Sequence, residues 1–292
     1  MISALIKAMR PRQWTKNGFI FFGLIFDKQL FLSEPFFRTL QGFFLFCLIS
    51  SAVYLFNDIA DIEGDRQHPQ KKHRPLASGL LPISVALGAA VILAIVALVL
   101  GYLLEPMFAV ILSVYLVLNL LYSRWLKHVP ILDVLIISSG FVLRVAAGVA
   151  LITVERFSPW LYMITILFSL YIGLGKRRAE MNLLEQGAGA HRKVLDGYTI
   201  PLLDQYITIV SGMTIVAYSL YTFSAPNLPL NHSMMLTIPF VVYGIFRYLQ
   251  LIQTGSAAGA PDEVALKDRQ TFGKSAHGLK AGGARHGFRK MT

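Results

Sequence analysis

Long apolar runs alternate with short polar segments along most of this chain. Apolar runs of about 20 residues are long enough to cross the hydrocarbon core of a bilayer as helices. The runs at 82–104 and 107–123 are joined by a tight turn at Glu105 and Pro106. The pattern predicts eight membrane-spanning helices, at residues 18–33, 36–56, 82–104, 107–123, 131–152, 159–175, 206–224 and 233–252.

The composition agrees with a membrane protein. Hydrophobic residues make up 55% of the 292 residues and charged residues only 15%, whereas a soluble domain carries about 25% charged residues. The one cysteine, Cys47, lies inside an apolar run, so we expect no disulfide framework. We therefore predict an all-α, polytopic membrane protein.

Positive charge is concentrated in alternate polar segments. The chain has a formal net charge of +11, and in a membrane protein such an excess indicates contact with anionic lipid rather than with nucleic acid. The Lys- and Arg-rich segments are residues 1–17, 57–80, 124–130 and 176–204. The positive-inside rule places all four segments on the cytoplasmic side. The N-terminus lacks the short apolar region of a cleaved signal peptide, so we expect none.

Acidic side chains are clustered just after the second apolar run. The polar residues of this cluster are Asn57, Asp58, Asp61 and Asp65. If the helix continues, the three aspartates fall within roughly 60° of one another, while Glu63 points to the opposite side. Such hard oxygen ligands suit Mg²⁺, which often bridges to substrate phosphate groups. The alternative is a solvated acidic turn followed by a basic loop that sets the membrane topology.

Basic side chains follow this cluster and occur again at the end of the sixth predicted span. Arg74 and its neighbours at 66–73 could bind the phosphate groups of a substrate. Lys176, Arg177 and Arg178 could hold an anionic substrate at the membrane surface. They could equally extend from a helix end into the interface and fix topology, as most such clusters do.

Two further polar features invite a functional interpretation. Asp196 and Asp204 lie eight residues apart in the polar loop at 176–204, called the second polar loop below, and they could form a second metal or phosphate site or cap a helix. Arg144 lies inside an apolar run, where a charge is costly and indicates function. Asp133 is 11 residues, or about 16 Å, along the same helix. Arg144 therefore needs a partner on another helix, a water-filled cavity or a ligand.

The acidic cluster resembles a known family signature. The sequence NDIADIEGD at 57–65 matches the NDxxDxxxD motif of the UbiA superfamily of intramembrane prenyltransferases. Four more blocks are similar to the branch of that superfamily that transfers phosphoribose to decaprenyl phosphate. They are RPRQWTKN at 10–17, DVLIISSGFVLRVAAG at 133–148, LGKRRAE at 174–180 and LTIPFVVYGIFRYL at 236–249. The similarity extends over residues 1–269, which we take as one transmembrane transferase domain.

The resemblance implies a nine-helix fold around a cavity in a bacterial inner membrane. It also implies transfer of 5-phosphoribose from phosphoribosyl diphosphate to a polyprenyl phosphate, with release of diphosphate. By this resemblance the catalytic Mg²⁺ ligands are Asn57, Asp58, Asp61 and Asp65. The expected substrate-binding residues are Lys16, Asn57, Arg74, Arg144, Lys176, Arg177, Arg178, Tyr198 and Asp204.

The C-terminal segment departs from the family. Residues 270–292 contain five Gly, five Lys or Arg and no acidic residue, which predicts a disordered basic tail. The last family helix is therefore expected to be missing. Two alternatives remain open: a prenyltransferase that moves an isoprenoid from its diphosphate to an aromatic or other acceptor, and a transporter or inactive lipid-binding protein.

Overall fold

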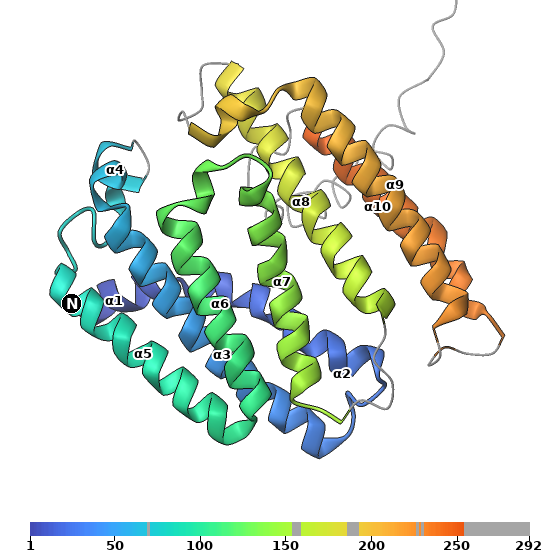
Figure 1. Cartoon of the computed structure of the whole chain (residues 1–292), viewed down its shortest axis with the longest axis horizontal. Helices are drawn as coiled ribbons and strands as arrows, with labels where there is room; N and C mark the ends of the chain where they lie inside the picture. The colour runs from blue at the N-terminus through green and yellow to red at the C-terminus, as the bar shows by residue number, and fades with distance from the viewer. Residues whose placement is uncertain (69–70, 154–158, 186–192, 226–227, 229–230, 254–292) are drawn as a thin grey trace, which may run out of the picture.

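The protein is all-helical throughout the part of the chain that the structure describes. This structure is a computed structural model, which describes residues 1–68, 71–153, 159–185, 193–225, 228 and 231–253 (Figure 1). The predicted tail at 270–292 and the domain boundary at 269 lie outside these residues. The α-helices are α1 Ile2–Met9, α2 Phe22–Phe26, α3 Ser33–Ala60, α4 Ile62–Gln67, α5 Ile83–Leu104, α6 Pro106–Arg124, α7 Leu132–Ala150, α8 Pro159–Glu185, α9 Ile200–Ser224 and α10 Ile238–Gln253. The 3₁₀ segments are η1 Pro11–Phe21, η2 Lys71–His73, η3 Leu126–His128, η4 Lys193–Gly197 and η5 Ser233–Thr237.

Seven helices among the described residues are long and apolar enough to cross a membrane. They begin with α3 and end with the segment Ser233–Gln253, and they match seven of the eight predicted spans. The predicted span at 18–33 is wrong. In its place η1 continues into α2, which ends after five residues at Phe26, and Lys28 then adopts a φ of 59°. The chain turns there, before α3 begins.

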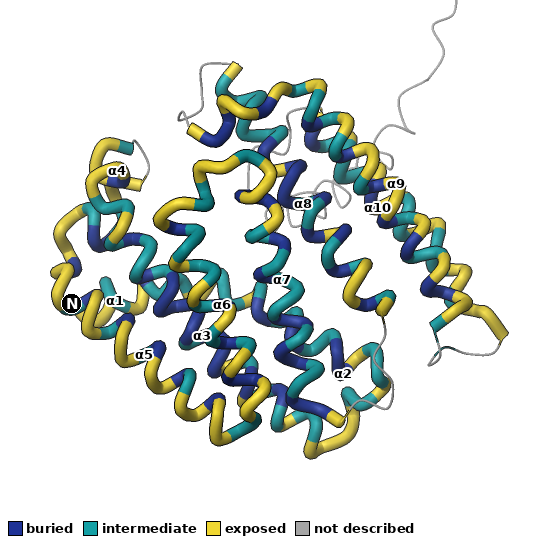
Figure 2. The backbone as a smooth tube through the Cα atoms, viewed as in Figure 1, coloured by how far each residue is buried: buried dark blue, intermediate teal, exposed yellow. Residues whose placement is uncertain are grey.

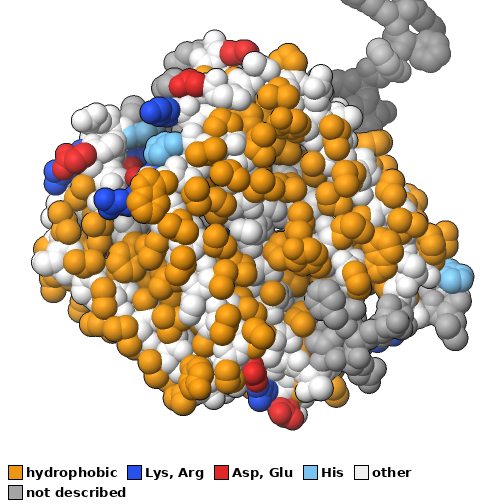
Figure 3. Space-filling model, in the orientation of Figure 1, with side chains coloured by type: hydrophobic (Ala, Val, Ile, Leu, Met, Phe, Trp, Pro, Cys, Tyr) orange, Lys and Arg blue, Asp and Glu red, His pale blue; other side chains and the backbone are white. Residues whose placement is uncertain are grey.

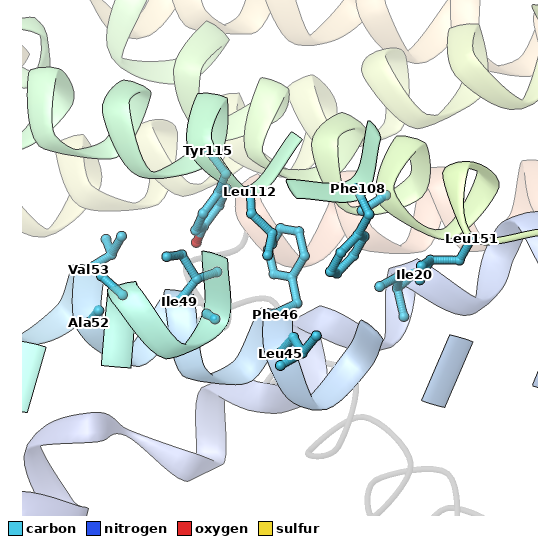
Figure 4. Close-up of a cluster of buried hydrophobic side chains, with 13 residues drawn as sticks. Ile20, Leu45, Phe46, Ile49, Ala52, Val53, Phe108, Leu112, Tyr115 and Leu151 are labelled. Atoms are coloured by element: carbon cyan, nitrogen blue, oxygen red, sulfur yellow. The ribbon is translucent and has the colours of Figure 1, made fainter. Parts of the chain in front are cut away.

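Two groups of helices make up the bundle. The core of the first group lies among α3, α5, α6, α7 and η1. Figure 4 shows its labelled side chains, which come from η1, α3 and α6 and from Leu151 just after α7. The second group packs α8, α9 and α10 beside α7. A stripe of small buried residues on α5 lets that helix approach α3 and α6 closely. The stripe consists of Ala86, Ala90, Ala94, Ala97 and Gly101.

One close backbone contact fixes η1 against α7. A Cβ added at Gly148 would lie 1.8 Å from the carbonyl oxygen of Ile20. No side chain fits between two backbones at that distance. The contact holds the polar residues of η1 beside the middle of α7.

The outer surfaces of the helices are apolar. Figure 2 shows exposed positions along the outer side of α5 and along α10. Figure 3 shows hydrophobic side chains across the middle of this face and charged ones near its ends. Exposed apolar helix faces of this kind suit contact with lipid chains. The protein is therefore a multi-pass membrane protein.

Candidate active site

The acidic cluster spans the junction between α3 and α4. Helix α3 ends at Ala60, and Asp61 serves both as its C-cap and as the residue before α4. The Asp61 N–H donates to the Asn57 carbonyl at 3.0 Å, and the Asp65 N–H donates to the Asp61 carbonyl at 2.8 Å. These hydrogen bonds continue the helical pattern, but Asp61 itself has a φ of −100° and a ψ of 8°, outside the helical region. Asp58 and Asp65 are buried on one side, whereas the Asp61 side chain is 40% exposed.

Two arginines bind the buried aspartates of the cluster. Arg74 Nη1 donates to Asp58 Oδ1 at 3.2 Å and to Asp65 Oδ2 at 2.5 Å. Arg10, which ends α1 with a φ of 55°, also forms an ion pair with Asp58. Asp58 and Asp65 are both buried. Their charges are compensated by cations from two different segments, the N-terminus and the loop after η2.

A lysine from a third segment completes the cluster. Lys127 of η3 places Nζ 2.5 Å from Asp61 Oδ1. Glu63, two residues further on, is 76% exposed and pairs with its neighbour Arg66. Glu63 therefore points away from the cluster, as the helical spacing indicates. Asp58 and Asp65 share Arg74, whereas Asp61 pairs separately with Lys127, so the three carboxylates and three cations form two neighbouring groups of ion pairs around the junction of α3 and α4.

His68 closes the loop beside these groups. Partial burial, followed by the positive charges of Lys71 and Arg74, lowers the pKa of His68 below its ordinary value, although Asp65 opposes the shift. The imidazole is therefore neutral at pH 7, and its Nδ1 accepts a hydrogen bond from the Lys71 N–H at 3.3 Å. This bond orders the start of the basic segment that carries Arg74.

The donors of the cluster have the chemistry that Mg²⁺ prefers. Asn57 Oδ1 is buried and makes no hydrogen bond within the described part of the chain. A buried amide oxygen without a hydrogen-bond partner, in the same segment as Asp58, Asp61 and Asp65, fits a hard cation. In the described ranges no three His, Cys, Asp or Glu side chains are close enough to share one ion. The carboxylates point instead to Arg10, Arg74 and Lys127, so metal binding requires them to exchange these partners.

The basic cluster on α8 serves mainly to join helices. Arg177 is buried, and its Nε donates to Asp133 Oδ2 at 2.6 Å while Nη1 donates to Glu180 Oε2 at 2.7 Å. Asp133 lies on α7, so the pair holds α7 against α8. Two protein carboxylates bind the Arg177 guanidinium, which gives it a structural role. That Arg177 also binds substrate stays a prediction.

The second polar loop meets the same ion pair. Tyr198 is buried, and its hydroxyl donates to Asp133 Oδ1 at 2.8 Å and accepts from the Ile131 N–H at 2.6 Å. Burial raises the pKa of the Tyr198 phenol above its ordinary value, so the proton remains on the hydroxyl. The sequence did not predict the pairing of Asp133 with Arg177 and Tyr198. The one indication in the sequence was an acidic residue at the start of an apolar run, which needs a buried partner.

Arg178 and Asp204 connect α8 with α9. Arg178 Nε donates to Asp204 Oδ1 at 2.9 Å, and Arg178 also bonds to Asn182. The interpretation of Asp204 as a helix cap is wrong, because the side chain of Thr199 caps α9 by accepting from the Leu202 N–H. Lys176 is exposed at this end of α8.

Lys16 lies on η1, and Arg144 of α7 lies beside the same segment. Lys16 is half-buried. The next residue, Asn17, accepts from Arg144 Nε at 2.9 Å, and Tyr115 Oη accepts from Arg144 Nη2 at 3.0 Å. Arg144 Nη1 donates to the Gly140 carbonyl at 2.7 Å. Arg144 thus has the partners on other helices that an intramembrane arginine needs.

Aromatic rings complete the environment of Arg144. The guanidinium carbon lies 4.9, 5.1 and 5.7 Å from the ring centroids of Tyr115, Phe46 and Phe141. No carboxylate forms an ion pair with Arg144 in the part of the chain that the structure describes. Cation–π contacts and neutral hydrogen-bond acceptors therefore stabilise this buried charge.

We expect Arg144→Met to lower the free energy of unfolding by about 2–4 kcal/mol, because it leaves Asn17 and Tyr115 without their buried partner. The thermal midpoint of the detergent-solubilised protein measures this change. Arg124→Met, at an exposed position, is the matched control and should shift the midpoint little. Equal midpoints for the two variants would contradict the structural role of Arg144.

The fold and the site together define a class of protein: a helical membrane bundle with acidic and basic side chains gathered at one end. The chain belongs to the UbiA prenyltransferase family, whose model matches residues 18–263. It is 36% identical, over 92% of its length and 88% of the relative's, to decaprenyl-phosphate phosphoribosyltransferase of Mycolicibacterium smegmatis. The protein of the same name from Corynebacterium glutamicum is 34% identical over 92% of this chain and 82% of its own.

Solved structures show the same fold at low sequence identity. A UbiA homologue from Archaeoglobus fulgidus bound to GPP and Mg²⁺ aligns with a TM-score of 0.70 and 14% identity. The alignment covers 86% of this chain and 87% of the homologue. Digeranylgeranylglyceryl phosphate synthase aligns with a TM-score of 0.63 and 17% identity, covering 88% of this chain and 91% of that one. The predicted all-α membrane fold and the predicted family are both confirmed.

Proposed function

We propose that the protein transfers 5-phosphoribose from phosphoribosyl diphosphate to a polyprenyl phosphate such as decaprenyl phosphate, with release of diphosphate. The observation that carries the proposal is the meeting of Asp58, Asp61 and Asp65 with three cations at one end of the bundle. The relatives named for this reaction, which match 92% of the chain, support the same substrates. In this proposal the site faces the cytoplasm from a bacterial inner membrane.

The acidic cluster would hold the diphosphate of the donor through Mg²⁺. Asn57, Asp58, Asp61 and Asp65 would be the ligands, and the bound ion would neutralise the departing diphosphate. Arg10, Arg74 and Lys127 lie within contact of these carboxylates. With the carboxylates holding the metal, these three cations would be free to bind the phosphate oxygens of the donor. Lys16 and Lys176 are further candidates for these oxygens.

The chemical step needs little proton transfer. The bond between ribose C1 and the diphosphate oxygen breaks, its electron pair leaves with diphosphate, and an oxygen of the lipid phosphate bonds to C1. The lipid phosphate is already an oxyanion at neutral pH, so no strong base is required. Fixed cations next to the leaving group and alignment of the two substrates would supply most of the acceleration.

Transfer of an isoprenoid is the second candidate function. The family is named for prenyl transfer, and the A. fulgidus homologue was solved with GPP and Mg²⁺. An isoprenyl diphosphate would present the same diphosphate to the acidic cluster. The two candidates therefore differ in the carbon that is transferred and in the acceptor.

A matrix of two donors and two acceptors separates these functions. Phosphoribosyl diphosphate and geranyl diphosphate are each combined with a polyprenyl phosphate and with an aromatic acid, and diphosphate release by the purified protein is measured. We expect turnover only with phosphoribosyl diphosphate and polyprenyl phosphate together, and we expect EDTA to abolish it. Turnover with geranyl diphosphate and the aromatic acid would favour the prenyltransferase. Substrate binding without turnover would favour a transporter or lipid-binding protein.

A further inference from the structure

The loop between α6 and α7 contains a strained turn. Ile131 has φ 70° and ψ −50°, and the Pro130 carbonyl accepts a hydrogen bond from the Leu132 N–H at 2.9 Å. These values describe a three-residue γ-turn of the rare, strained kind. A β-branched residue at positive φ is unfavourable unless its surroundings hold it in place.

Residues of the second polar loop fix this turn in place. Tyr198 Oη accepts the Ile131 N–H at 2.6 Å and donates to Asp133 Oδ1 at 2.8 Å. Asp133 is in turn fixed by the buried Arg177. A Cβ added at Gly197 would lie 2.2 Å from Pro130 Cγ, so the backbone of the polar loop packs directly against the turn.

The other end of the same loop reaches the acidic cluster. Lys127 belongs to η3, which ends at His128, and it contacts Asp61 at 2.5 Å. Only two residues separate η3 from Ile131. So short a connection leaves little freedom for one end to move without the other. The loop therefore connects the acidic cluster with the second polar loop.

We propose that Tyr198 is a positioning residue whose hydroxyl holds the turn at Ile131 and so keeps Lys127 beside Asp61. Its effect on catalysis rests on the function proposed above, whereas its effect on Lys127 does not. In this arrangement Tyr198 acts through the backbone of the α6–α7 loop. The resemblance assigned Tyr198 to substrate binding, and the two roles give different results on substitution.

The test measures how fast Lys127 of the purified protein is acylated, with mass spectrometry of the labelled peptides and without substrate. Tyr198→Phe removes the hydroxyl that accepts from Ile131, and we expect Lys127 to be labelled at least about threefold faster because the loop opens more often. Labelling of the exposed Lys193 is the internal reference. Tyr243→Phe, at a position 57% exposed on α10, is the matched control.

A second substitution distinguishes the turn from a contact with substrate. Glycine adopts positive φ without a Cβ clash, so Tyr198→Phe combined with Ile131→Gly should bring Lys127 labelling and turnover back toward wild type. Tyr198→Phe combined with Ile131→Ala should not. Unchanged Lys127 labelling in Tyr198→Phe would overturn the proposal, even if turnover falls, because that result assigns Tyr198 to the substrate.

Gly197→Ala provides an independent route to the same turn. The added methyl group would push Pro130 without removing any hydrogen-bonding group, and it should also accelerate Lys127 labelling. Wild-type labelling in a folded Gly197→Ala protein would contradict the proposal. If Lys127 labelling responds as expected but no variant or wild type turns over the proposed substrates, the proposed function fails while the coupling stands.

Discussion

Asp61→Asn is expected to reduce Mg²⁺-dependent diphosphate release by about two to three orders of magnitude. The substitution removes a negative charge that would hold Mg²⁺, and the Mg²⁺ would stabilise the departing diphosphate. Asp61 is the most exposed aspartate of the cluster, at 40%, and its one ion-pair partner among the described residues is Lys127. Its substitution therefore leaves the buried pairs of Asp58 and Asp65 intact. Initial rates at several Mg²⁺ concentrations measure the effect.

Glu63→Gln is the matched control for this prediction. It makes the same change of charge two residues away, but Glu63 is 76% exposed and contacts only Arg66 in the described structure. We expect near wild-type turnover and equal amounts of both variants in the membrane. A fall in turnover for Glu63→Gln as large as that for Asp61→Asn would mean that the total acidic charge matters, and not the geometry of the cluster.

Arg177→Met is expected to destabilise the protein by about 3–5 kcal/mol, because it leaves Asp133 as a buried charge without its partner. The side chains of this pair are 2% and 0% exposed. Denaturant unfolding of the solubilised protein, followed by tryptophan fluorescence, measures the change. Adding Asp133→Leu to Arg177→Met should recover much of the loss, since the double variant contains no unpaired charge.

Arg178→Met gives the comparison within the same basic cluster. Its partner Asp204 is 35% exposed, so solvent screens the pair, and its loss should cost less than about 1 kcal/mol. If both arginine variants unfold at the same denaturant concentration, the assignment of Arg177 to helix joining is wrong.

Helices could be predicted from the sequence wherever one long apolar run forms one helix. The run at 82–104 corresponds to α5, Ile83–Leu104, because Pro82 precedes it and Glu105 and Pro106 end it. The prediction of a membrane-spanning helix at 18–33 was wrong, because tertiary contacts determine the shape of η1 and α2. Gly148 of α7 and the hydrogen bond between Arg144 and Asn17 hold that segment, and neither contact is visible in local hydropathy.

The candidate site was only partly predictable for a related reason. Helical spacing could bring the aspartates together because they lie within nine residues of one another. Their cations come from elsewhere: Arg10 lies 48 residues before Asp58, and Lys127 lies 66 residues after Asp61. A count of basic residues cannot say which loop reaches which acid, or that Arg177 pairs with Asp133 of the preceding helix.

The mass of the lipid product tests most directly whether the protein transfers phosphoribose to a polyprenyl phosphate. Purified protein is incubated with phosphoribosyl diphosphate, polyprenyl phosphate and Mg²⁺, and the extracted lipids are analysed by mass spectrometry. We expect a lipid that is heavier than the acceptor by one phosphoribosyl group, that is absent without Mg²⁺ and that is strongly reduced for Asp61→Asn. An unchanged lipid under conditions in which the protein is folded and binds both substrates would contradict it.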